Sequence, residues 1–167
     1  MNWQHEILDE VPQGGEFTEV FFGKDQSGDF TWIRFFNGTD AWLGVFQNGG
    51  SPDKISAYTF NHRTAVLADK TVYIIDLAIK SALLIQVSKN AFQDLIADEK
   101  SVFAADFTTI HVIENARLIK VIDGYYFDMF RFKSITPTVV LGEFFQYGGD
   151  WNDLQIDRQS LVIRGRE

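Results

Sequence analysis

Nucleophilic catalysis is the first chemistry to test against the residues of this chain. It needs a nucleophile beside a base that a third group holds in place. The sequence has no cysteine and no Gly-x-Ser-x-Gly segment, and its histidines are His5, His62 and His111. His111 lies between Ile110 and Val112 in an apolar run, which is typical of a partly buried aromatic position. The sequence therefore predicts no catalytic residue.

Metal binding is the second chemistry, and its signals are weak. Zinc sites need three or four converging Cys, His or carboxylate ligands, and the histidines here are scattered. Asp25, Ser27 and Asp29 have the spacing of the first oxygen ligands of a calcium loop. Phe30 and Phe36 stand where that loop needs a glycine and a bidentate glutamate. We therefore predict a hairpin loop here, no metal ion and no cofactor.

Aromatic side chains could bind a ligand directly, because their rings can stack on a sugar or anchor a protein partner. The candidate binding residues are Trp32, Trp42, Tyr58 and Trp151. In a sugar-binding cleft, nearby carboxylates could do acid–base work. The candidate carboxylates are Glu19, Asp123, Asp128, Glu143 and Asp157. The other interpretation is that the rings pack in the core and the acids face solvent.

The charge balance limits the partners. The chain carries a net charge of −8, and its Lys and Arg residues form no run or stripe. Duplex DNA and anionic membranes repel such a surface, so we predict no nucleic-acid and no membrane partner. Arg158, Arg164 and Arg166 are the one local cationic cluster, which fits either a solvated last strand and tail or a phosphate site. An acidic surface suits a basic protein partner.

Length and composition favour one ordinary domain. The 167 residues fit a single β-rich domain, residues 1–167, that can bury a core without a disulfide or metal. The lack of cysteine favours a reducing compartment. The start, MNWQHEILDEVPQGGEF, lacks the basic and apolar parts of a secretory signal, and no apolar run is long enough to cross a bilayer. We expect a cytoplasmic protein.

Short runs of aromatic and β-branched residues between Gly, Asn and Asp predict an all-β fold. The clearest hairpin is TWIRFF-NG-TDAWLGVF, in which Asn37-Gly38 predicts a two-residue type I′ turn with positive φ at both residues. Both faces of this hairpin carry apolar residues, so we expect both to be covered. Further strands are predicted at residues 17–22, 54–60, 64–68, 71–77, 82–87, 101–105, 108–113, 118–122, 125–132, 138–145, 153–157 and 161–164.

One segment, SKNAFQDLIADEK, predicts a helix instead. Phe92, Leu95 and Ile96 have the i, i+3, i+4 spacing of one helix face, and Asn90 opens a pattern that resembles a capping box. We therefore expect one short helix over residues 91–97.

Three stretches suggest a repeated unit. Residues 64–69 read TAVLAD, residues 101–106 read SVFAAD and residues 138–143 read TVVLGE, so successive starts are 37 residues apart. A second apolar strand follows the first two stretches with a shift of 38, which implies one extra residue in the turn. Each unit then ends in a third strand. The other explanation is chance similarity between strands rich in Val and Ile.

The repeat predicts which residues are equivalent. We expect Val66, Phe103 and Val140 to point into the core from the first strands, and Ile74 and Val112 from the second strands. Meanders at about this spacing are typical of propeller blades or stacked β-meanders. The predicted fold is all-β, with repeated antiparallel β-meanders in an incomplete propeller-like arrangement or a two-sheet stack, and one short helix.

The second half of the chain has a recognisable layout: a strand, a short turn containing Asp, a second strand, an Asp-Gly, and a late Gly before a Trp. The matching segments are Phe103-Ala104-Ala105-Asp106, Ile110-His111-Val112, Asp123-Gly124, Leu141-Gly142 and Asp150-Trp151. This layout resembles an uncharacterised family of small bacterial all-β proteins with propeller-like meanders. The resemblance implies an all-β meander and implies no activity.

Two hypotheses of function follow. The first is a non-catalytic protein-binding module, and one concrete version is an immunity-type inhibitor that covers a basic partner. The second is a small carbohydrate-binding or carbohydrate-processing protein with an aromatic cleft and carboxylates. We favour the first, without enzymatic activity, because catalytic motifs are absent and opposite charges speed association. An open meander also leaves edge strands that could pair two copies into a homo-oligomer.

Overall fold

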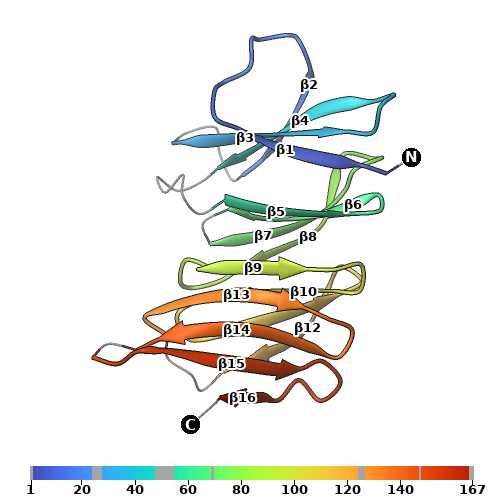
Figure 1. Cartoon of the computed structure of the whole chain (residues 1–167). Coiled ribbons are helices and arrows are strands. Elements are labelled where there is room, and N and C mark those ends of the chain that lie inside the picture. Colours follow the sequence, from blue (N-terminus) through green and yellow to red (C-terminus); the bar gives the residue numbers. More distant parts are fainter. Residues whose placement is uncertain are drawn as a thin grey trace. The chain divides into compact units, whose positions relative to one another are not determined.

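Every regular element that the structure describes is a β-strand. The computed structural model of the chain describes residues 2–23, 28–47, 55–68, 70–123, 127–146 and 148–165. Within these ranges sixteen strands form four sheets of four strands, and no helix occurs. Figure 1 shows the strands of each sheet, coloured along the chain. The predicted all-β fold of repeated meanders is confirmed.

The chain divides into two compact units, Met1–Val87 and Ser88–Glu167. This division does not decide whether the chain is one domain, so the single domain over residues 1–167 stays a prediction. The strands of unit 1 are β1 (Gln4–Leu8), β2 (Thr18–Phe22), β3 (Phe30–Phe36), β4 (Ala41–Gln47), β5 (Ile55–Phe60), β6 (Arg63–Ala68), β7 (Thr71–Asp76) and β8 (Ser81–Val87). Sheet 1 has the order β1-β3-β4-β2 and sheet 2 the order β5-β6-β7-β8.

Unit 2 also contains two sheets. Its strands are β9 (Asp94–Ala97), β10 (Ser101–Ala105), β11 (Ile110–Glu114), β12 (Arg117–Ile122), β13 (Met129–Ile135), β14 (Val139–Phe145), β15 (Trp151–Asp157) and β16 (Ile163–Gly165). Sheet 3 has the order β12-β11-β10-β9 and sheet 4 the order β13-β14-β15-β16. Sheets 2, 3 and 4 are antiparallel meanders, whereas in sheet 1 β2 pairs parallel to β4.

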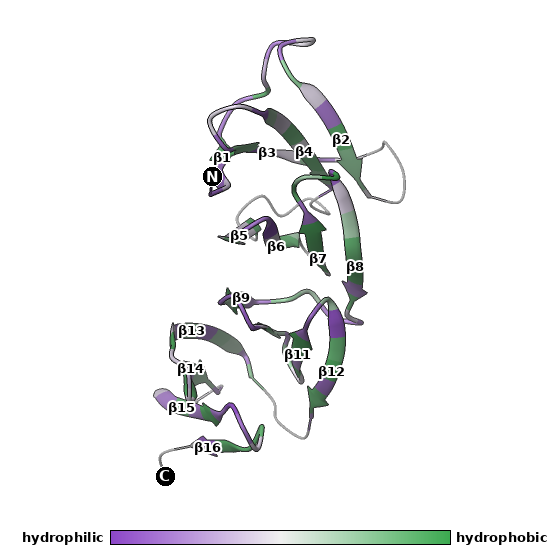
Figure 2. Ribbon diagram, turned by 90° about the vertical axis from the view of Figure 1, so that its right-hand side faces the viewer, coloured by the Kyte–Doolittle hydropathy of each residue, from purple (hydrophilic) through white to green (hydrophobic). Residues whose placement is uncertain are grey.

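The core of unit 1 lies between one face of sheet 1 and one face of sheet 2. Alternate residues of a strand point to the same face, so Ile33 and Phe35 of β3 meet Val66 of β6 and Tyr73 of β7 in one buried cluster. In Figure 2 β7 is coloured as hydrophobic. Burying each large apolar side chain contributes about 1.5–3 kcal/mol to folding. We call the face of a sheet that enters its unit's core the inner face, and the opposite one the outer face.

Gly44 of β4 makes room for the aromatic rings of this core. A Cβ atom at position 44 would lie 2.6 Å from the Phe46 ring and 2.9 Å from the Phe35 ring. Real side chains do not approach so closely, so the packing of these two rings requires a glycine between them.

The core of unit 2 is built in the same way from the inner faces of sheets 3 and 4. Phe103 of β10 and Val112 of β11 belong to one buried cluster with Phe130 of β13 and Val140 of β14. Phe127 precedes β13 and packs its ring 5.1 Å from that of Phe130.

The repeat places the three opening stretches on equivalent strands. TAVLAD starts at the second residue of β6, SVFAAD starts at the first residue of β10, and TVVLGE starts one residue before β14. Each of these three strands is the second strand along the chain in its sheet. Val66 and Val140 are 0% exposed and Phe103 is 1% exposed, and all three point into the core of their unit. The predicted equivalence of these three positions is confirmed.

The second strands match with a different offset from the one that the sequence suggested. Val66 pairs with Tyr73 on β7, whereas Phe103 pairs with Val112 on β11. Tyr73, rather than Ile74, is therefore the equivalent of Val112, and the turn before β11 is two residues longer than the one before β7. Ile74 is buried, but it points to the outer face of sheet 2 because a shift of one residue reverses the face. The prediction for Ile74 was wrong in this respect.

The hairpin of β3 and β4 forms, but its turn is not type I′. Phe36 pairs with Ala41, so four residues connect the strands, and only Gly38 among them has a positive φ, of 90°. The carboxamide oxygen of Asn37 accepts the N–H groups of Thr39 at 3.0 Å and Asp40 at 2.9 Å. The Asn37 side chain thus satisfies two backbone N–H groups of the turn, which makes the longer connection favourable.

A turn with positive φ at both central residues occurs elsewhere. Asn115 and Ala116 have φ values of 48° and 56°, and they connect β11 to β12 directly, since Glu114 pairs with Arg117. An alanine in this conformation costs about 1–2 kcal/mol.

The helix predicted over residues 91–97 is absent, and Asp94–Ala97 form the edge strand β9 instead. The N–H of Gln93 donates to the carbonyl of Ala105 at 2.7 Å, which already belongs to the pairing with sheet 3. Leu95 and Ile96 are both buried, on opposite faces of a strand. The apolar residues whose spacing suggested one face of a helix therefore lie on two faces of a strand. Pairing with β10 decides the structure of this segment against its local pattern.

Most predicted strands are present with ends shifted by one to three residues. The strand over 101–105 matches β10 at both ends. Residues 54, 125 and 126 of two predicted strands lie outside the described residues. The sequence analysis missed β1, which has no alternating β-branched residues and pairs with β3. The described residues contain no helix that could span a membrane.

Candidate protein-binding surface

Trp42, one of the four predicted binding residues, has no exposed surface. It is 0% exposed in the core of unit 1, and its ring centroid lies 4.7 Å from that of Phe35 and 6.3 Å from that of Phe22. A ligand cannot reach this side chain, so its selection as a binding residue was wrong. The alternation of β4 points Trp42 to the inner face of sheet 1, where it packs as a core residue.

The structure does not bring the aromatic candidates of unit 1 into one cleft. Trp32 pairs with Val45 and lies on the outer face of sheet 1, opposite Trp42. Tyr58 of β5 is 37% exposed and pairs with Ala65, on the face of sheet 2 that points away from the core. The core of unit 1 thus separates Trp32 from Tyr58. The role of each as a binding residue stays a prediction.

Trp151 lies on the outer face of sheet 4, in unit 2. Along β15 its side chain alternates with Leu154 and Ile156, which point into the core. The neighbouring strands add a mixture of apolar and charged groups to this face. We call this surface the Trp151 face, and its residues are Met129, Arg131, Lys133, Val139, Leu141, Glu143, Phe145, Trp151, Asp153, Gln155, Asp157 and Arg164.

The apolar side chains of the Trp151 face are well exposed. Met129 is 50% exposed, Trp151 is 40% exposed and Leu141 is 37% exposed. The guanidinium of Arg131 lies over the Trp151 ring, with its carbon 4.4 Å from the centroid. Beside these residues a depression of about 370 Å³ opens between Leu141, Lys133 and their neighbours on β15 and β16. Exposed Trp, Met and Arg side chains around a depression are typical of protein-binding hot spots.

A buried carboxylate organises the charges of this face. Glu143 is 6% exposed, and it forms ion pairs with Arg131 and Lys133. The ammonium group of Lys133 also pairs with Asp153 at 3.0 Å. A bulge between Phe132 and Ser134 of β13 accompanies this arrangement. The network fixes the orientation of Arg131, and with it the stacking on Trp151.

The ion pairs set the protonation states of the two central groups. The hydrogen bond from Lys133, followed by that from Arg131, holds the pKa of Glu143 below its ordinary value. The hydrogen bond to Glu143, followed by that to Asp153, raises the pKa of Lys133. Glu143 therefore stays a carboxylate at neutral pH, which suits a structural anchor and disfavours a general acid, because that role needs a raised pKa.

The outer face of sheet 1 is a second surface of similar design. Glu6 and Arg34 form an ion pair at 2.9 Å, and the Arg34 guanidinium carbon lies 4.9 Å from the centroid of the Phe36 ring. We call this surface the Arg34 face, and its residues are Glu6, Glu19, Phe21, Phe30, Trp32, Arg34, Phe36, Leu43 and Val45.

The rings of the Arg34 face are partly exposed. Phe30 packs its ring 5.5 Å from that of Phe21 and 6.4 Å from that of Trp32. Leu43 and Val45, on the same face, are buried. The sequence predicted that both faces of this hairpin are covered. The inner face is covered, whereas on the outer face Leu43 and Val45 are buried and the aromatic rings stay partly exposed. A depression of about 290 Å³ lies at the end of the face, between Phe17, Arg34, Phe36 and the turn after β3.

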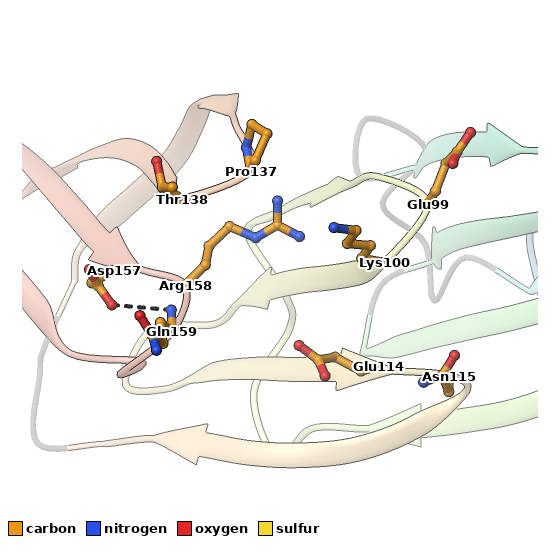
Figure 3. Close-up of a pocket in the computed structure, with 9 residues that line it drawn as sticks. All are labelled: Glu99, Lys100, Glu114, Asn115, Pro137, Thr138, Asp157, Arg158 and Gln159. Carbon is orange, nitrogen blue, oxygen red and sulfur yellow. Dashed lines mark hydrogen bonds between the residues drawn. The ribbon is translucent and has the colours of Figure 1, made fainter.

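A cavity of about 540 Å³ in unit 2 lies among turns of sheets 3 and 4 (Figure 3). Its lining is polar: the carboxylates of Glu99, Glu114 and Asp157 stand beside Lys100 and Arg158. Ligand pockets are mostly apolar with a few polar groups, so this lining does not resemble a small-molecule site.

Arg158 at this cavity is a structural bridge rather than a free cation. Its side chain is 8% exposed, and it pairs with Asp98 at 2.7 Å. It also donates to Ser101 Oγ at 2.6 Å and to the carbonyl of Thr136. The guanidinium is therefore engaged on several sides, which disfavours the phosphate site considered for this cluster. Arg164 of the cluster is exposed on the Trp151 face, and Arg166 lies outside the described residues.

His111 and Asp106 belong to a hydrogen-bond network beside the turn that connects the central strands β10 and β11 of sheet 3. The carboxylate of Asp106 accepts the Ser88 hydroxyl and the N–H groups of Thr108 at 2.7 Å and Thr109 at 2.6 Å. His111 Nε2 lies 3.0 Å from Thr109 Oγ1. Burial favours a raised pKa of Asp106, but these hydrogen bonds outweigh it and lower that pKa. Burial lowers the pKa of His111. The network caps the turn between β10 and β11 and agrees with the partly buried position predicted for His111.

Among the described residues, no group of three or more His, Asp or Glu side chains gathers as metal ligands would. Asp25 and Ser27 of the calcium-like segment lie outside those residues. Among the candidate carboxylates, Asp157 accepts the N–H groups of Ser160 at 2.8 Å and Gln159 at 3.1 Å, so it shapes the turn after β15.

The sequence indicated Trp151, Glu143 and Arg164 as candidates but not Met129, Arg131 and Lys133. The alternation of Met129 and Arg131 with the core residues Phe130 and Phe132 along β13 is the signal that could have revealed an exposed face. In this segment the sequence indicated Asp128 as a candidate carboxylate, and Asp128 precedes β13.

Comparison with known proteins supports the fold. No protein-family model matches the chain, and no curated protein matches it. Among solved structures, the Neurospora crassa Pan2 WD40 domain is 9% identical, with a TM-score of 0.55 over 98% of this chain and 55% of that chain. A chain in the S. cerevisiae structure of dbp5 bound to nup159, gle1, ip6 and adp is 10% identical, with a TM-score of 0.51 over 84% of this chain and 45% of that chain. The computationally designed Ika4 protein is 13% identical, with a TM-score of 0.46 over 93% of this chain and 92% of that chain.

The likenesses to the two natural structures show a propeller-like fold of β-meanders and nothing about activity, because the identities are low. The chain spans about half the length of the two natural structures that it matches. The resemblance to a bacterial family, drawn from the sequence, stays a prediction.

Proposed function

We propose that this chain is a non-catalytic protein-binding module and that the Trp151 face is its binding surface. The observation that carries the proposal is the exposure of Met129, Trp151 and Leu141 around an arginine whose position the buried Glu143 fixes. A rigid aromatic and arginine anchor loses little conformational freedom on binding, so it can contribute strongly to affinity. Propeller-like meanders offer a rigid scaffold for such a face.

The net charge of −8 supports the finer proposal of a basic partner, in the form of an immunity-type inhibitor. Opposite net charges accelerate association over distances of about a Debye length, ~8–10 Å. The Trp151 face itself is neutral, because its three cations, Arg131, Lys133 and Arg164, match the three carboxylates of Glu143, Asp153 and Asp157. Long-range attraction from the rest of the acidic chain, rather than ion pairs at this face, would therefore guide a basic partner.

The carbohydrate alternative rests on Trp151 with Glu143 and Asp153 nearby. Arg131 covers one side of the indole ring, so a sugar could stack only on the other side. The lowered pKa of Glu143 supports binding rather than processing of a sugar.

The proposed pairing of two copies through edge strands has support from two exposed strands. On β8, Leu83 is 40%, Ile85 is 56% and Val87 is 49% exposed. On β12, Ile119 is 53% and Val121 is 40% exposed, and Figure 2 shows hydrophilic and hydrophobic colours alternating along this strand. Exposed apolar edges can pair with another strand.

Site-specific crosslinking tests the proposed function. A photoreactive amino acid replaces Met129 in cells that normally make the protein, and Val162, 49% exposed and outside the Trp151 face, is the matched control. We expect protein adducts from position 129 and at least about tenfold fewer after Trp151→Ala, since loss of a hot-spot residue costs about 2 kcal/mol or more. Equal adduct yields from both positions would contradict the proposal, and adducts with glycans alone would favour the carbohydrate alternative.

A further inference from the structure

We propose that the Arg34 face is a second binding surface, and that it takes a basic protein segment whose lysine and arginine side chains lie on its aromatic rings. The inference goes beyond the proposed function, because it concerns unit 1 and does not depend on the Trp151 face. The partner is a different protein, since a second copy of a chain with a net charge of −8 would be repelled.

The apolar part of this surface is aromatic. Four rings are partly exposed on the outer face of sheet 1, on β2 and β3: Phe21, Phe30, Trp32 and Phe36. The face of an aromatic ring carries negative charge density and attracts cations. The chain already makes this contact here, because the Arg34 guanidinium lies 4.9 Å from the centroid of the Phe36 ring. The other rings of the face can take cations from a partner in the same way.

The negative charge of the chain concentrates in sheet 1. Residues 1–47, which form this sheet and its connections, contain eight carboxylates and two cations, so they carry −6 of the net charge of −8. The charged groups of the Arg34 face itself are Glu6, Glu19 and Arg34. Glu6 pairs with Arg34 at 2.9 Å. Glu19 is exposed and forms no ion pair among the residues that the structure describes, so one carboxylate of the face is uncompensated.

A loop over residues 9–17 adds carboxylates beside the face. It connects β1 to β2, the two edge strands of sheet 1, and Figure 1 and Figure 2 show it on the side of this sheet that points away from sheet 2. The loop carries no lysine or arginine, and its exposed acids are Asp9, Glu10 and Glu16. Phe17, at its end, lines the depression of the Arg34 face. A segment that lies on the face would therefore also pass these carboxylates.

The middle of the loop stands clear of the sheet. A Cβ atom at Gly14 or Gly15 would meet no atom within 4 Å. The loop makes a local turn, in which the N–H of Glu16 donates to the carbonyl of Gln13 at 3.4 Å. The loop therefore does not seal the rings of the face, which agrees with their partial exposure.

The depression at the end of the face has the size of a site for one side chain. Its volume of about 290 Å³ lies below the range of about 300–1,000 Å³ that is typical of small-molecule pockets. The rings of Phe17 and Phe36 form part of its wall. The two cations near it, Arg34 and Lys80, are each paired with a carboxylate, so they leave no excess of positive charge. A lysine or arginine side chain of the partner can therefore enter beside these rings.

The size of the face indicates a segment rather than a whole domain. Four strands about 4.8 Å apart and about six residues long cover about 400 Å², and an extended segment of about six residues crosses them. Such a contact removes about 800 Å² from water, below the range of about 1,200–2,000 Å² of stable interfaces. We therefore expect a reversible complex with an extended basic segment.

The test titrates the purified 167-residue chain with a synthetic peptide of about eight residues, alternating arginine and serine, and follows the backbone amides by NMR. A peptide that alternates glutamate and serine is the matched probe. The charge variant combines Glu10→Gln, Glu16→Gln and Glu19→Gln. Its matched control makes the same change of net charge at three exposed carboxylates of unit 2, with Glu99→Gln, Asp123→Asn and Asp150→Asn.

Two ring variants test the aromatic contacts. Trp32→Leu and Phe36→Leu each keep an apolar side chain but remove a ring. Circular dichroism confirms that each variant is folded, and should one of the two unfold, the other provides the comparison.

We expect the arginine peptide to bind at about 20 mM salt and to shift the amides of β1, β2, β3 and the loop. The charge variant should bind at least about threefold more weakly, because each exposed charge pair contributes a factor of about 1.4–5. Its matched control should change the affinity by less than about twofold, and each ring variant should lower it by about two- to fivefold. Raising the salt to about 0.3 M should weaken binding by the wild type more than by the charge variant.

Absence of binding at low salt would overturn the inference, as would equal binding of the glutamate peptide. Equal losses in the charge variant and its matched control would also overturn it, because the peptide would then respond only to net charge. The same holds for unchanged binding in both ring variants, or for amide shifts confined to sheet 4. None of these results bears on crosslinking at position 129, so the proposed function is tested separately.

Discussion

Replacing Arg158 with alanine should destabilise unit 2. The side chain is 8% exposed and bonds Asp98, Ser101 and the carbonyl of Thr136. Breaking a buried ion pair costs about 3–5 kcal/mol. The Asp98 side chain is 31% exposed and can be rehydrated, so we expect a loss of about 2–3 kcal/mol in the free energy of unfolding.

Native-state hydrogen exchange measures this loss within unit 2. A loss of about 2–3 kcal/mol makes the amides of β10 and β14 exchange about 30- to 160-fold faster when they exchange through opening of the unit. Arg164→Ala is the matched control, because Arg164 is exposed and its loss should change stability by less than about 0.5 kcal/mol. Arg158→Lys keeps the charge but not the planar fork, so it should restore only part of the loss.

The pH dependence of the same variant gives an independent check. Burial favours a raised pKa of Asp98, but the hydrogen bonds from Arg158 and from the backbone of Ser101 and Lys100 outweigh it and lower that pKa. A lowered pKa in the folded state contributes stability that is present above the ordinary Asp value and is lost as pH falls through the lowered value. The difference between wild type and Arg158→Ala should therefore shrink in acid. If the variant matches Arg164→Ala at neutral pH, the bridge described for Arg158 is wrong.

Three further predictions concern the repeat, one turn and the buried histidine. Phe103→Ala should lower the free energy of unfolding by about 3–5 kcal/mol, because it leaves a cavity in the core of unit 2. Lys70 is exposed, so Lys70→Ala should change that free energy by less than about 0.5 kcal/mol in urea unfolding. Equal changes in the two variants would contradict the equivalence of the repeated strands. Ala116→Gly should stabilise the folded protein by about 0.5 kcal/mol, because the relief of about 1–2 kcal/mol of backbone strain exceeds the entropic cost of a more flexible unfolded chain. A lower melting temperature would show that the turn is unstrained. Burial lowers the pKa of His111, so stability should fall as pH drops below about 6.5, and His111→Phe should flatten this dependence in thermal melts; an unchanged slope would assign the dependence to another group.

The strands could be predicted from the sequence where both faces carry apolar residues. β10 is apolar at nearly every position, and its predicted bounds agree with the structure. β1 and β9 are edge strands that local patterns did not reveal. β1 pairs with β3, which is not the next strand in the sequence, whereas β9 pairs with the adjacent β10. The segment of β9 even imitated a helix, because residues buried on two faces of a strand can have helical spacing.

Turns show the same limit at shorter range. The sequence Asn37-Gly38 is a strong signal for a two-residue turn, yet the Asn37 side chain bonds Thr39 and Asp40 and a four-residue connection forms. At Asn115-Ala116 the two-residue turn forms with a residue that local preference disfavours. In both places the register of the flanking strands decides the turn, and register depends on the whole sheet.

The candidate surface could be predicted only in part. An exposed Trp151 was predicted, but the same reasoning chose the buried Trp42, because composition does not reveal which face of a strand a residue occupies. The charged partners Arg131 and Glu143 lie 12 positions apart, on neighbouring strands. Their pairing follows from the register of β13 and β14, which the sequence alone does not provide.

The ion pairs of the two outer faces bear on why these surfaces should select a particular partner. The inner faces of sheets 1 and 4 pack through apolar residues, whereas each outer face places an arginine–glutamate pair beside an aromatic ring. A partly buried ion pair adds little net stability, but an approaching surface that leaves either charge unpaired pays a large desolvation cost. Rings such as Trp151 and Phe36 can therefore be covered favourably only by a surface that also satisfies Arg131 or Arg34. This requirement disfavours unspecific hydrophobic contacts at both faces and favours a partner whose charges are placed to match.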